Sequence, residues 1–315
     1  MKTLTRAIAC AAVAFASAGA LAQQSVKILI PANPGGGWDQ TGRTLGKVMT
    51  EAKLVSSVQF DNRGGAGGTI GLAQFVSSAS GDPNQMLIGG QAMVSAVELN
   101  KSAVRVQQAT PLARLVAEYS VIVVPANSPY KTMADVIKDF KAIPGAVSWG
   151  AGSAGSTEHL LIGLIAKAVG MDAGKINYVA FKGGGEAVPA IVGGHVQVGA
   201  SGLGEFADYI KSGKMRALAV SSPTAMEGIP SLKEQGIDVV FGNWRGIWGA
   251  PGITPAQRDA LIKNVKAATE TAEWKAMLAK MGWSPVYISG DEFGRFVDSE
   301  SRSLGELIVS LGLRK

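Results

Sequence analysis

The stretch Ile28-Leu29-Ile30-Pro31-Ala32-Asn33-Pro34-Gly35-Gly36-Gly37-Trp38-Asp39 joins a short apolar run, a glycine turn and the start of a helix. Three successive glycines remove every Cβ from the bend, so backbone N–H groups can approach a ligand closely. The first N–H groups of a helix lack partners within the helix, and the helix dipole favours an anion beside them. The stretch therefore predicts a strand, a turn and a helix that begins at an anion-binding site.

The chain begins with the features of a secretory signal peptide. Lys2 and Arg6 supply positive charge, residues 7–16 form a short apolar run, and residues 20–22 form an A-x-A cleavage site. The apolar run is too short to anchor the chain in a bilayer. We therefore expect residues 1–22 to be a cleaved signal peptide.

The composition is typical of a folded globular protein. Hydrophobic residues make up 47% of the chain and charged residues 17%, and no later apolar run spans a membrane without Gly, Pro or charge. Removal of Lys2 and Arg6 lowers the formal charge from +6 to +4, and the positive residues are scattered. Nucleic acid and membrane surfaces are therefore poor partners. The only cysteine, Cys10, lies in the predicted signal peptide, so the mature chain lacks thiol chemistry.

Short apolar runs alternate with amphipathic stretches along the mature chain. The predicted strands are 26–30, 58–60, 86–88, 146–149, 176–181, 196–200 and 216–221, and the predicted helices are 38–51, 68–78, 133–140, 157–169, 186–192, 203–210, 255–269, 273–281 and one from about 291. Strands that alternate with helices indicate βαβ crossovers and mostly parallel sheets. In such sheets, ligands bind beyond the carboxyl ends of the strands, where the glycine turns lie.

An extended segment at 112–124 separates two α/β series, which predicts two lobes with a ligand cleft between them. Residues 222–230 contain Pro and Gly and would return the chain to the first lobe. We predict that residues 23–117 and 225–315 form the first lobe and residues 118–224 the second. An apolar stripe along the last helix predicts that this helix packs on the first lobe.

Four glycine-rich turns follow predicted strands and open predicted helices. They are residues 34–39, 62–69, 150–157 and 182–186. One such turn is commonly plain strand-to-helix geometry, but four turns from two lobes would direct several helix N-termini into one cleft. Their recurrence therefore favours an anion-binding cleft.

Two other interpretations of the third turn are weaker. Residues 150–155 match G-x-G-x-x-G, but the next strand ends in Lys182 where a dinucleotide site needs an acidic residue. Ser153 also lies in a turn that resembles a nucleophile elbow. His159 is too close along the same helix to serve as its base, and nothing marks His195 for that role. No Cys, His or carboxylate cluster has metal-ligand spacing, so we expect neither a metal nor a cofactor.

Each candidate side chain also has a structural interpretation. Asp39 could contact a ligand or pair with Arg43 at i+4, and Trp38 could line the cleft or fill the core. The hydroxyl groups of Ser153, Ser156, Thr157 and Ser201 could cap helices or donate to a carboxylate. Lys182 could supply positive charge or simply be exposed.

The combined motifs resemble those of extracytoplasmic solute receptors of tripartite tricarboxylate transporters, over nearly the whole mature chain. The residues that carry the resemblance are Pro34-Gly35-Gly36-Gly37-Trp38-Asp39 with Arg43, residues 62–68, Gly155-Ser156-Thr157-Glu158-His159, residues 183–187, Gly193-Gly194-His195-Val196 and Asn243-Trp244-Arg245-Gly246. The Gly-Gly-Gly-Trp-Asp form is most similar to the tricarboxylate-binding branch.

The resemblance implies a two-lobed periplasmic binding protein of type II-like fold, which closes on a carboxylated solute and delivers it to a two-subunit membrane permease. It places one ligand carboxylate between the first and third glycine turns. Ser201 stands about where many members have an acidic or amide residue, which would suit a ligand with more carboxylates and disfavour an amino acid. The ligand-binding residues that we predict are Asn33, Gly36, Gly37, Trp38, Asp39, Gly67, Ser153, Ser156, Thr157, Lys182 and Ser201.

These observations predict a monomeric periplasmic receptor for a di- or tricarboxylate such as citrate, without catalytic activity. A secreted serine hydrolase that uses Ser153 is one alternative. A carboxylate sensor for a signalling partner is another, since a sensor would use the same pair of lobes.

Overall fold

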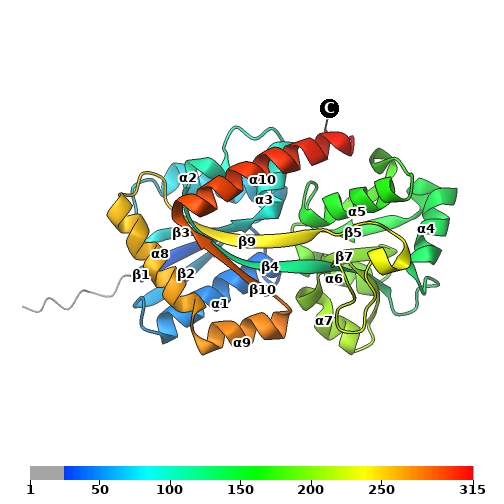
Figure 1. Cartoon of the computed structure of the whole chain (residues 1–315), viewed down its shortest axis with the longest axis horizontal. Coiled ribbons are helices and arrows are strands. Elements are labelled where there is room, and N and C mark those ends of the chain that lie inside the picture. Colours follow the sequence, from blue (N-terminus) through cyan, green and yellow to red (C-terminus); the bar gives the residue numbers. More distant parts are fainter. Residues whose placement is uncertain (1–24, 315) are drawn as a thin grey trace, which may run out of the picture.

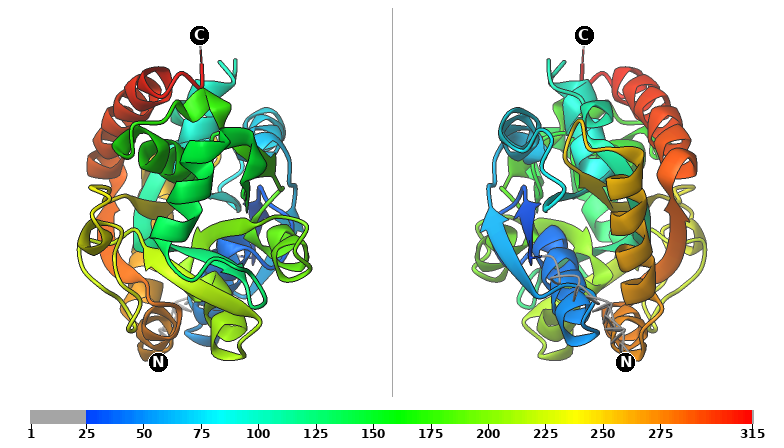
Figure 2. Two further views of the ribbon diagram at one scale, coloured as in Figure 1. Left: turned by 90° about the vertical axis from the view of Figure 1, so that its right-hand side faces the viewer. Right: turned by 90° about the vertical axis from the view of Figure 1, so that its left-hand side faces the viewer.

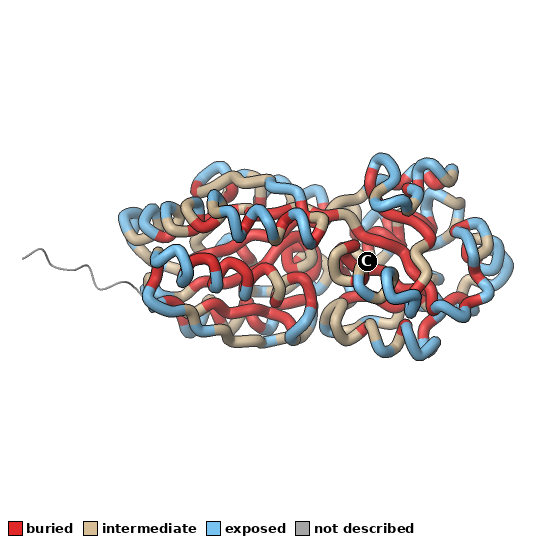
Figure 3. The backbone as a smooth tube through the Cα atoms, turned by 90° about the horizontal axis from the view of Figure 1, so that it is seen from below, coloured by how far each residue is buried: buried red, intermediate tan, exposed pale blue. Residues whose placement is uncertain are grey.

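The structure, a computed structural model, describes residues 25–314, so the predicted signal peptide lies outside the described residues. Two α/β lobes lie side by side along the long axis (Figure 1). Seen from below, the backbone narrows between them (Figure 3). Within residues 25–314, no helix is both long enough and apolar enough to cross a membrane. The two-lobed α/β fold that the sequence predicts is confirmed.

The strands of residues 25–314 form one ten-stranded mixed sheet in the order β2-β1-β3-β9-β4-β7-β5-β6, with β8 and β10 also paired to β4. They are β1 (Ser25–Ile30), β2 (Ser57–Asn62), β3 (Gln85–Gly90), β4 (Thr110–Pro125), β5 (Ser148–Ala151), β6 (Asn177–Ala180), β7 (Val198–Gly202), β8 (Met215–Val220), β9 (Gly242–Gly249) and β10 (Ser284–Ser289). β1 pairs in parallel with β2 and β3, and β5 does so with β6 and β7. Both lobes therefore use the crossover connections that the alternating pattern predicts.

Helices flank both halves of the sheet. The first lobe contains α1 (Gly37–Glu51), α2 (Thr69–Ser78), α3 (Gln91–Leu99), α8 (Pro255–Thr269), α9 (Ala272–Met281) and α10 (Gly290–Ser310), and the second contains α4 (Met133–Ala142), α5 (Thr157–Ala168), α6 (Gly184–Val192) and α7 (Leu203–Lys211). Buried apolar residues form a cluster between sheet and helices in each lobe. A third cluster includes side chains from both lobes.

β4 runs through both lobes. Its first half pairs with β9 and β10, and its second half pairs with β7 and β8. After β8 the chain stays hydrogen-bonded to that strand: Leu232 N–H donates to Val220 O at 2.9 Å, and Phe241 N–H to Ser221 O at 3.0 Å. It then enters β9 beside the first half of β4. The exact division at residues 118 and 225 stays a prediction.

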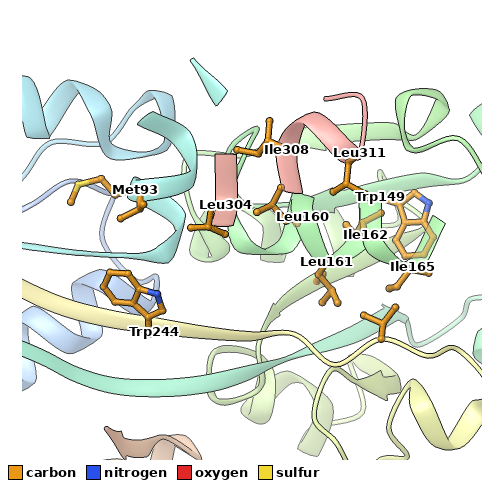
Figure 4. Close-up of a cluster of buried hydrophobic side chains, with 14 of the residues drawn as sticks. Met93, Trp149, Leu160, Leu161, Ile162, Ile165, Trp244, Leu304, Ile308 and Leu311 are labelled. Atoms are coloured by element: carbon orange, nitrogen blue, oxygen red, sulfur yellow. The ribbon is translucent and has the colours of Figure 1, made fainter. Parts of the chain in front are cut away.

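The last helix, α10, lies along one flank of the molecule (Figure 2). It packs on α3 in the first lobe, as its apolar stripe predicts. Its C-terminal end also reaches the second lobe, where Leu304, Ile308 and Leu311 approach the apolar side chains of α5 (Figure 4). A Cβ on Gly163 of α5 would lie 2.9 Å from Leu311 Cδ1. The prediction that this helix packs on the first lobe is therefore incomplete, because α10 contacts both lobes.

The sequence analysis missed three elements, α3, β9 and β10. β9 has the sequence Gly-Asn-Trp-Arg-Gly-Ile-Trp-Gly, which lacks the apolar alternation or β-branched run of a typical strand. Its residues from Asn243 to Gly249 are nevertheless buried, because the strand lies between β3 and β4. α3 follows β3 directly, because Gly90 both ends the strand and is the N-cap of the helix.

Candidate functional site

A cavity of about 80 Å³ lies between the two lobes at the glycine turns. This is room for roughly five or more water molecules. The residues that line it are Pro31, Ala32, Gly36, Gly37, Trp38, Gly67, Gly68, Ala92, Gly152, Ser153, Ser156, Glu158, Lys182, Gly183, Gly184, Ser201, Glu205, Asn243 and Arg245. Turns from both lobes thus meet at one site, as the sequence predicts.

The first-lobe wall of the cavity consists mainly of helix N-termini. Gly36, Gly68 and Gly90 are the N-cap residues of α1, α2 and α3, and among the described residues no side chain caps any of these three ends. The first turns of α2 and α3 also contain no acidic residue. This wall therefore presents free backbone N–H groups and the positive ends of helix dipoles.

Close packing explains two of the glycines on this wall. Gly68 has φ +90°, a left-handed conformation that favours glycine, and a Cβ there would lie 2.8 Å from Trp38 Cζ3. A Cβ on Gly37 would lie 1.9 Å from Arg245 Nη2 and 2.5 Å from Glu205 Oε1. The glycine turn thus lets α1 begin directly against a charged pair.

The second-lobe wall carries acidic side chains at its helix N-termini. Ser156 is the N-cap of α5, and its Oγ accepts from His159 N–H at 3.4 Å and donates to Glu158 Oε2 at 2.7 Å. At the start of α7, Ser201 Oγ donates to Glu205 Oε2 at 3.1 Å. Each of these two serines therefore binds a carboxylate of the protein itself in this structure.

Arg245 lies at the centre of a buried charge network. Its Nη2 donates to Glu118 Oε1 and, at 3.0 Å, to Glu205 Oε1. Its side chain is 3% exposed, and its guanidinium carbon lies 4.9 Å from the centre of the Trp283 ring. Glu118 also accepts from Asn243 Nδ2 at 3.2 Å and from Trp283 Nε1 at 2.8 Å. Arg245 and Asn243 come from β9 and Glu118 from β4, so the network lies where these strands connect the lobes.

The acidic residues of the cavity have raised pKa values. The net pKa of Glu205 is about 8. Burial is the largest cause of the increase, Arg245 opposes it, and Glu118 and Glu158 add to it. Burial also raises the pKa of Glu158 above its ordinary 4.5, against the lowering effect of the Ser156 hydroxyl. Low-dielectric surroundings and like charges both disfavour the ionised form of a second or third carboxyl group beside a single guanidinium.

Most of the predicted site residues line the cavity. They are Gly36, Gly37, Trp38, Gly67, Ser153, Ser156, Lys182 and Ser201. Contact of these residues with a ligand stays a prediction. Ser153 Oγ donates to Phe181 O at 3.2 Å in this structure.

Three predicted residues do not line the cavity. Asp39 is 5% exposed, and its carboxylate accepts from Arg43, Asn62 Nδ2 and the Gly35 N–H, which favours its structural interpretation. Asn33 and Thr157 each hydrogen-bond across the two lobes. Asn33 Nδ2 donates to Glu186, and Thr157 Oγ1 donates to Asn243 Oδ1 at 3.1 Å.

The structure argues against His159 as a base for Ser153. Its Nδ1 accepts a hydrogen bond from the Gly155 N–H at 2.9 Å, and its ring stacks on Tyr178 with centroids 4.1 Å apart. Burial lowers the pKa of His159 to about 4. The residue therefore stabilises the start of α5. Among residues 25–314, no three His, Cys, Asp or Glu side chains are placed to hold a metal ion.

The sequence analysis missed the charged residues of the cavity. Glu158 and Arg245 appeared only inside larger motifs, and Glu118 and Glu205 were not singled out. One signal for Glu118 was present, because it is a carboxylate within the otherwise largely apolar segment 112–124. Glu205 lies in the first turn of its helix, as Asp39 does.

Two α/β lobes joined by β4 and β9, with a donor-lined cavity between them, define a solute-binding protein. Comparisons with known proteins specify the class. Residues 43–313 match the model of the tripartite tricarboxylate transporter family receptor, and the chain belongs to this family. Its relatives by sequence and by structure are solute-binding proteins.

Individual relatives are distant in sequence. The "UPF0065 protein in gbd 5'region" of Cupriavidus necator is 27% identical over 306 residues, which cover 95% of this chain and 91% of the relative. The structure of periplasmic binding protein BugD superposes with a TM-score of 0.84 at 23% identity, covering 93% of this chain and 99% of BugD. MatC from Rhodopseudomonas palustris with bound malate gives a TM-score of 0.79 at 19% identity, covering 90% and 99%. These structural likenesses establish the shared fold.

Proposed function

We propose that this chain is a periplasmic receptor that closes over a small di- or tricarboxylate, citrate-like in its anionic groups, and delivers it to a two-subunit membrane permease. We further propose that residues 1–22 direct export and are then cleaved, and that the mature chain acts as a monomer. The observation that supports the proposal is the convergence of three uncapped helix N-termini on one interlobe cavity. The bound malate of MatC, a relative in fold, is a dicarboxylate and agrees with this class of ligand.

The energetics of such a site are adequate for a receptor. A hydrogen bond to a charged group contributes roughly 1.5–3 kcal/mol. Three or four of them reach the roughly 8 kcal/mol of micromolar binding. The first-lobe wall offers backbone donors from three helices, and Lys182 supplies a positive charge on the opposite wall. Serine hydroxyls that now bind Glu158 and Glu205 could exchange these partners for a ligand oxygen.

Contacts across the cleft support a closed form that a permease would recognise. Asn33 bonds to Glu186, Thr157 bonds to Asn243, and Arg245 bonds to Glu205, each from one lobe to the other. A ligand that fits between the lobes would shift the population toward this form. Delivery then requires only that the permease distinguish the closed form from the open one.

Thermal unfolding of residues 23–315 tests the ligand class. The additives are citrate, cis-aconitate, succinate, glutamate, a sugar and a nucleotide, each in large excess. A ligand at about a thousand times its dissociation constant adds roughly 4 kcal/mol, which raises the midpoint by about 10 °C. We expect such a shift with di- or tricarboxylates. A shift with the nucleotide alone, or none with any carboxylate, would overturn the proposal.

The permease is tested separately by uptake of the same carboxylate in cells. Uptake should require this chain together with a two-subunit permease encoded by neighbouring genes, and it should be lost when the gene for either one is deleted. Ligand binding without any transport defect on deletion would instead favour the sensor function.

A further inference from the structure

Two glutamates share one cation at the cavity wall. Glu118 Oε1 and Glu205 Oε1 both accept from Nη2 of Arg245, and the three side chains are 3%, 8% and 3% exposed. Glu118 has two further donors, Asn243 Nδ2 and Trp283 Nε1. Glu118 thus accepts hydrogen bonds from three donors, one of them charged. Glu118 is therefore the partner that neutralises Arg245.

Glu205 has much less support for a negative charge. Besides its share of Arg245, it accepts from the Ser201 hydroxyl at 3.1 Å, and both of these groups line the cavity. Glu158 faces the same cavity and adds a further acidic group, whereas Lys182 is the other cationic side chain of the lining. Within the cavity lining and its buried neighbour Glu118, three carboxyl groups thus stand against two cations.

Charged groups also lie on the other side of Glu205. Glu205 also borders a second hollow, whose charged lining residues are Arg43, Asp208, Lys211, Glu227 and Lys280. Arg43 is already paired with Asp39 at 2.9 Å. Asp208 and Lys211 lie on α7 itself and are opposite in charge. This hollow therefore does not remove the surplus of acidic groups around Arg245.

The proposed ligand would add further negative charge to this cavity. A carboxylate of the ligand cannot approach an ionised Glu205 without strong repulsion, since both lie in a low-dielectric site. A protonated carboxyl, in contrast, donates a hydrogen bond to a carboxylate oxygen. We propose that Glu205 is protonated in the ligand-bound receptor and donates its O–H to the ligand, so that one proton from solvent binds together with each carboxylate ligand. This inference rests on the proposed function.

The pKa of Glu205 agrees with this role. Burial raises it to about 8 in the closed form, and a nearby ligand anion would raise it further. In an open form, where water reaches the carboxyl, the pKa would return toward its ordinary 4.5. A raised pKa means that the bound state holds more protons than the free state. Affinity is therefore highest at low pH and falls as the pH rises toward the pKa of the bound state.

Isothermal titration calorimetry of the mature chain tests proton uptake directly. The main probe is succinate, which is essentially fully ionised near pH 7. Citrate, which still holds a fraction of a proton there, is the second probe, and each is titrated in two buffers of different ionisation enthalpy. Near pH 7 we expect uptake of about one proton per ligand. The dissociation constant should rise by up to about tenfold per pH unit until the bound carboxyl ionises.

Glu205→Gln assigns the proton to its site. The amide still donates a hydrogen bond but does not titrate, so it resembles the protonated carboxyl of wild type. We expect it to bind at pH 7 at least as tightly as wild type does, without proton uptake or pH dependence. Glu158→Gln removes another acid of the cavity, and Asp208→Asn removes an exposed charge one turn along α7. Asp208→Asn is the matched control and should keep the proton uptake of wild type, whereas Glu158→Gln tests the competing assignment of the proton to Glu158.

The outcomes separate this inference from the function on which it rests. Binding of citrate or succinate without proton uptake and with a constant affinity overturns the inference and leaves the receptor function intact. Proton uptake that persists in Glu205→Gln and vanishes in Glu158→Gln overturns the assignment to Glu205. Stronger binding of glutamate than of succinate, with no proton uptake, would show that an ionised Glu205 pairs with a ligand cation. Failure of every carboxylate to bind at any pH overturns both proposals.

Discussion

The wall of the cavity from the first lobe is mostly backbone, whereas the wall from the second lobe is mostly side chain. Helices α2 and α3 begin at uncapped glycines and have no acid in their first turns, whereas α6 and α7 also begin at uncapped glycines but have Glu186 and Glu205 there. Helices α5 and α7 begin beside Ser156 and Ser201, which hold Glu158 and Glu205. A glycine turn before a helix therefore does not by itself define an anion site, because an acid in the first helical turn can occupy the same position.

The largest expected effect comes from removal of the cation between the walls. Arg245→Met leaves Glu118 and Glu205 buried without their guanidinium, which should cost about 3–5 kcal/mol of stability. This corresponds to a fall of about 10 °C in the unfolding midpoint, measured by calorimetry. The control is Lys47→Met, whose side chain is 72% exposed and pairs with the exposed Glu51, so it should cost less than about 1 kcal/mol. Equal losses in the two variants would contradict the buried network.

The next largest effect compares two adjacent glycines of the first-lobe wall. Gly37→Ala places a Cβ 1.9 Å from Arg245 Nη2, and the buried Arg245 can move away only by leaving Glu118 and Glu205. We expect the variant to bind its carboxylate about 100-fold more weakly, by titration calorimetry. In Gly36→Ala the nearest atom to the new Cβ is 3.6 Å away, so affinity should stay within a few-fold. A harmless Gly37→Ala would show that the turn is not tightly packed against the pair.

A smaller effect is expected from the serine on the second-lobe wall. Ser156→Ala removes the N-cap of α5, which should cost about 1 kcal/mol of stability. Thr254→Ala removes the N-cap of α8 and should cost a similar amount, but α8 does not line the cavity. If Ser156 also contacts the ligand, as we predict, only Ser156→Ala weakens binding, by about tenfold. Equal affinities of the two variants would restrict Ser156 to capping.

A further effect is one of pH, and it has opposite signs for Glu205 on the second-lobe wall and for Asp39 beside the first glycine turn. Glu205, with its pKa raised to about 8, contributes stability fully below about pH 4.5 and loses it as pH rises toward 8. Burial alone would raise the pKa of Asp39, but hydrogen bonds from Arg43, Asn62 and Gly35 together hold it below 3.8. Asp39 therefore contributes stability above that value and loses it in acid.

Urea unfolding measures both effects. The effect of Glu205 is measured with saturating succinate up to about pH 9, because its pKa is raised in the closed form, and that of Asp39 without ligand down to about pH 3. Glu205→Gln should flatten the loss between about pH 5 and pH 8, and Asp39→Asn should flatten the loss below about pH 4. If each variant changed the other pH range instead, the assignment of the two carboxyls would be reversed.

The sequence was sufficient to predict the parts of the fold and site that are local. Residues 28–39 contain their own strand, turn and helix start, and α1 indeed begins at Gly37. Alternation of apolar runs likewise located the parallel strands of both lobes. Eight of the eleven predicted site residues line the cavity, because most of them lie on the glycine-rich turns.

The charged network could not be predicted in this way. Glu118 and Arg245 are 127 residues apart, and Glu205 and Arg245 are 40 apart, so no local pattern connects them. Arg245 lies on β9, whose glycines and polar residues do not predict a strand. This strand forms because it pairs with β3 and β4 on either side. The expectation that Ser201 lowers the negative charge of the cleft did not take account of Glu205, whose carboxyl accepts from the Ser201 hydroxyl one helical turn later.

The contact of α10 with both lobes has a mechanical consequence. Leu311 rests on Gly163 of the second lobe, while the preceding turns of the same helix pack on α3 of the first. Any rotation that separates the lobes must break or shift this apolar contact. The contact therefore adds to the free-energy cost of lobe opening, whether or not a ligand occupies the cavity. Shortening the chain before Leu311 would remove this contact, and the lobes would then separate at a lower free-energy cost.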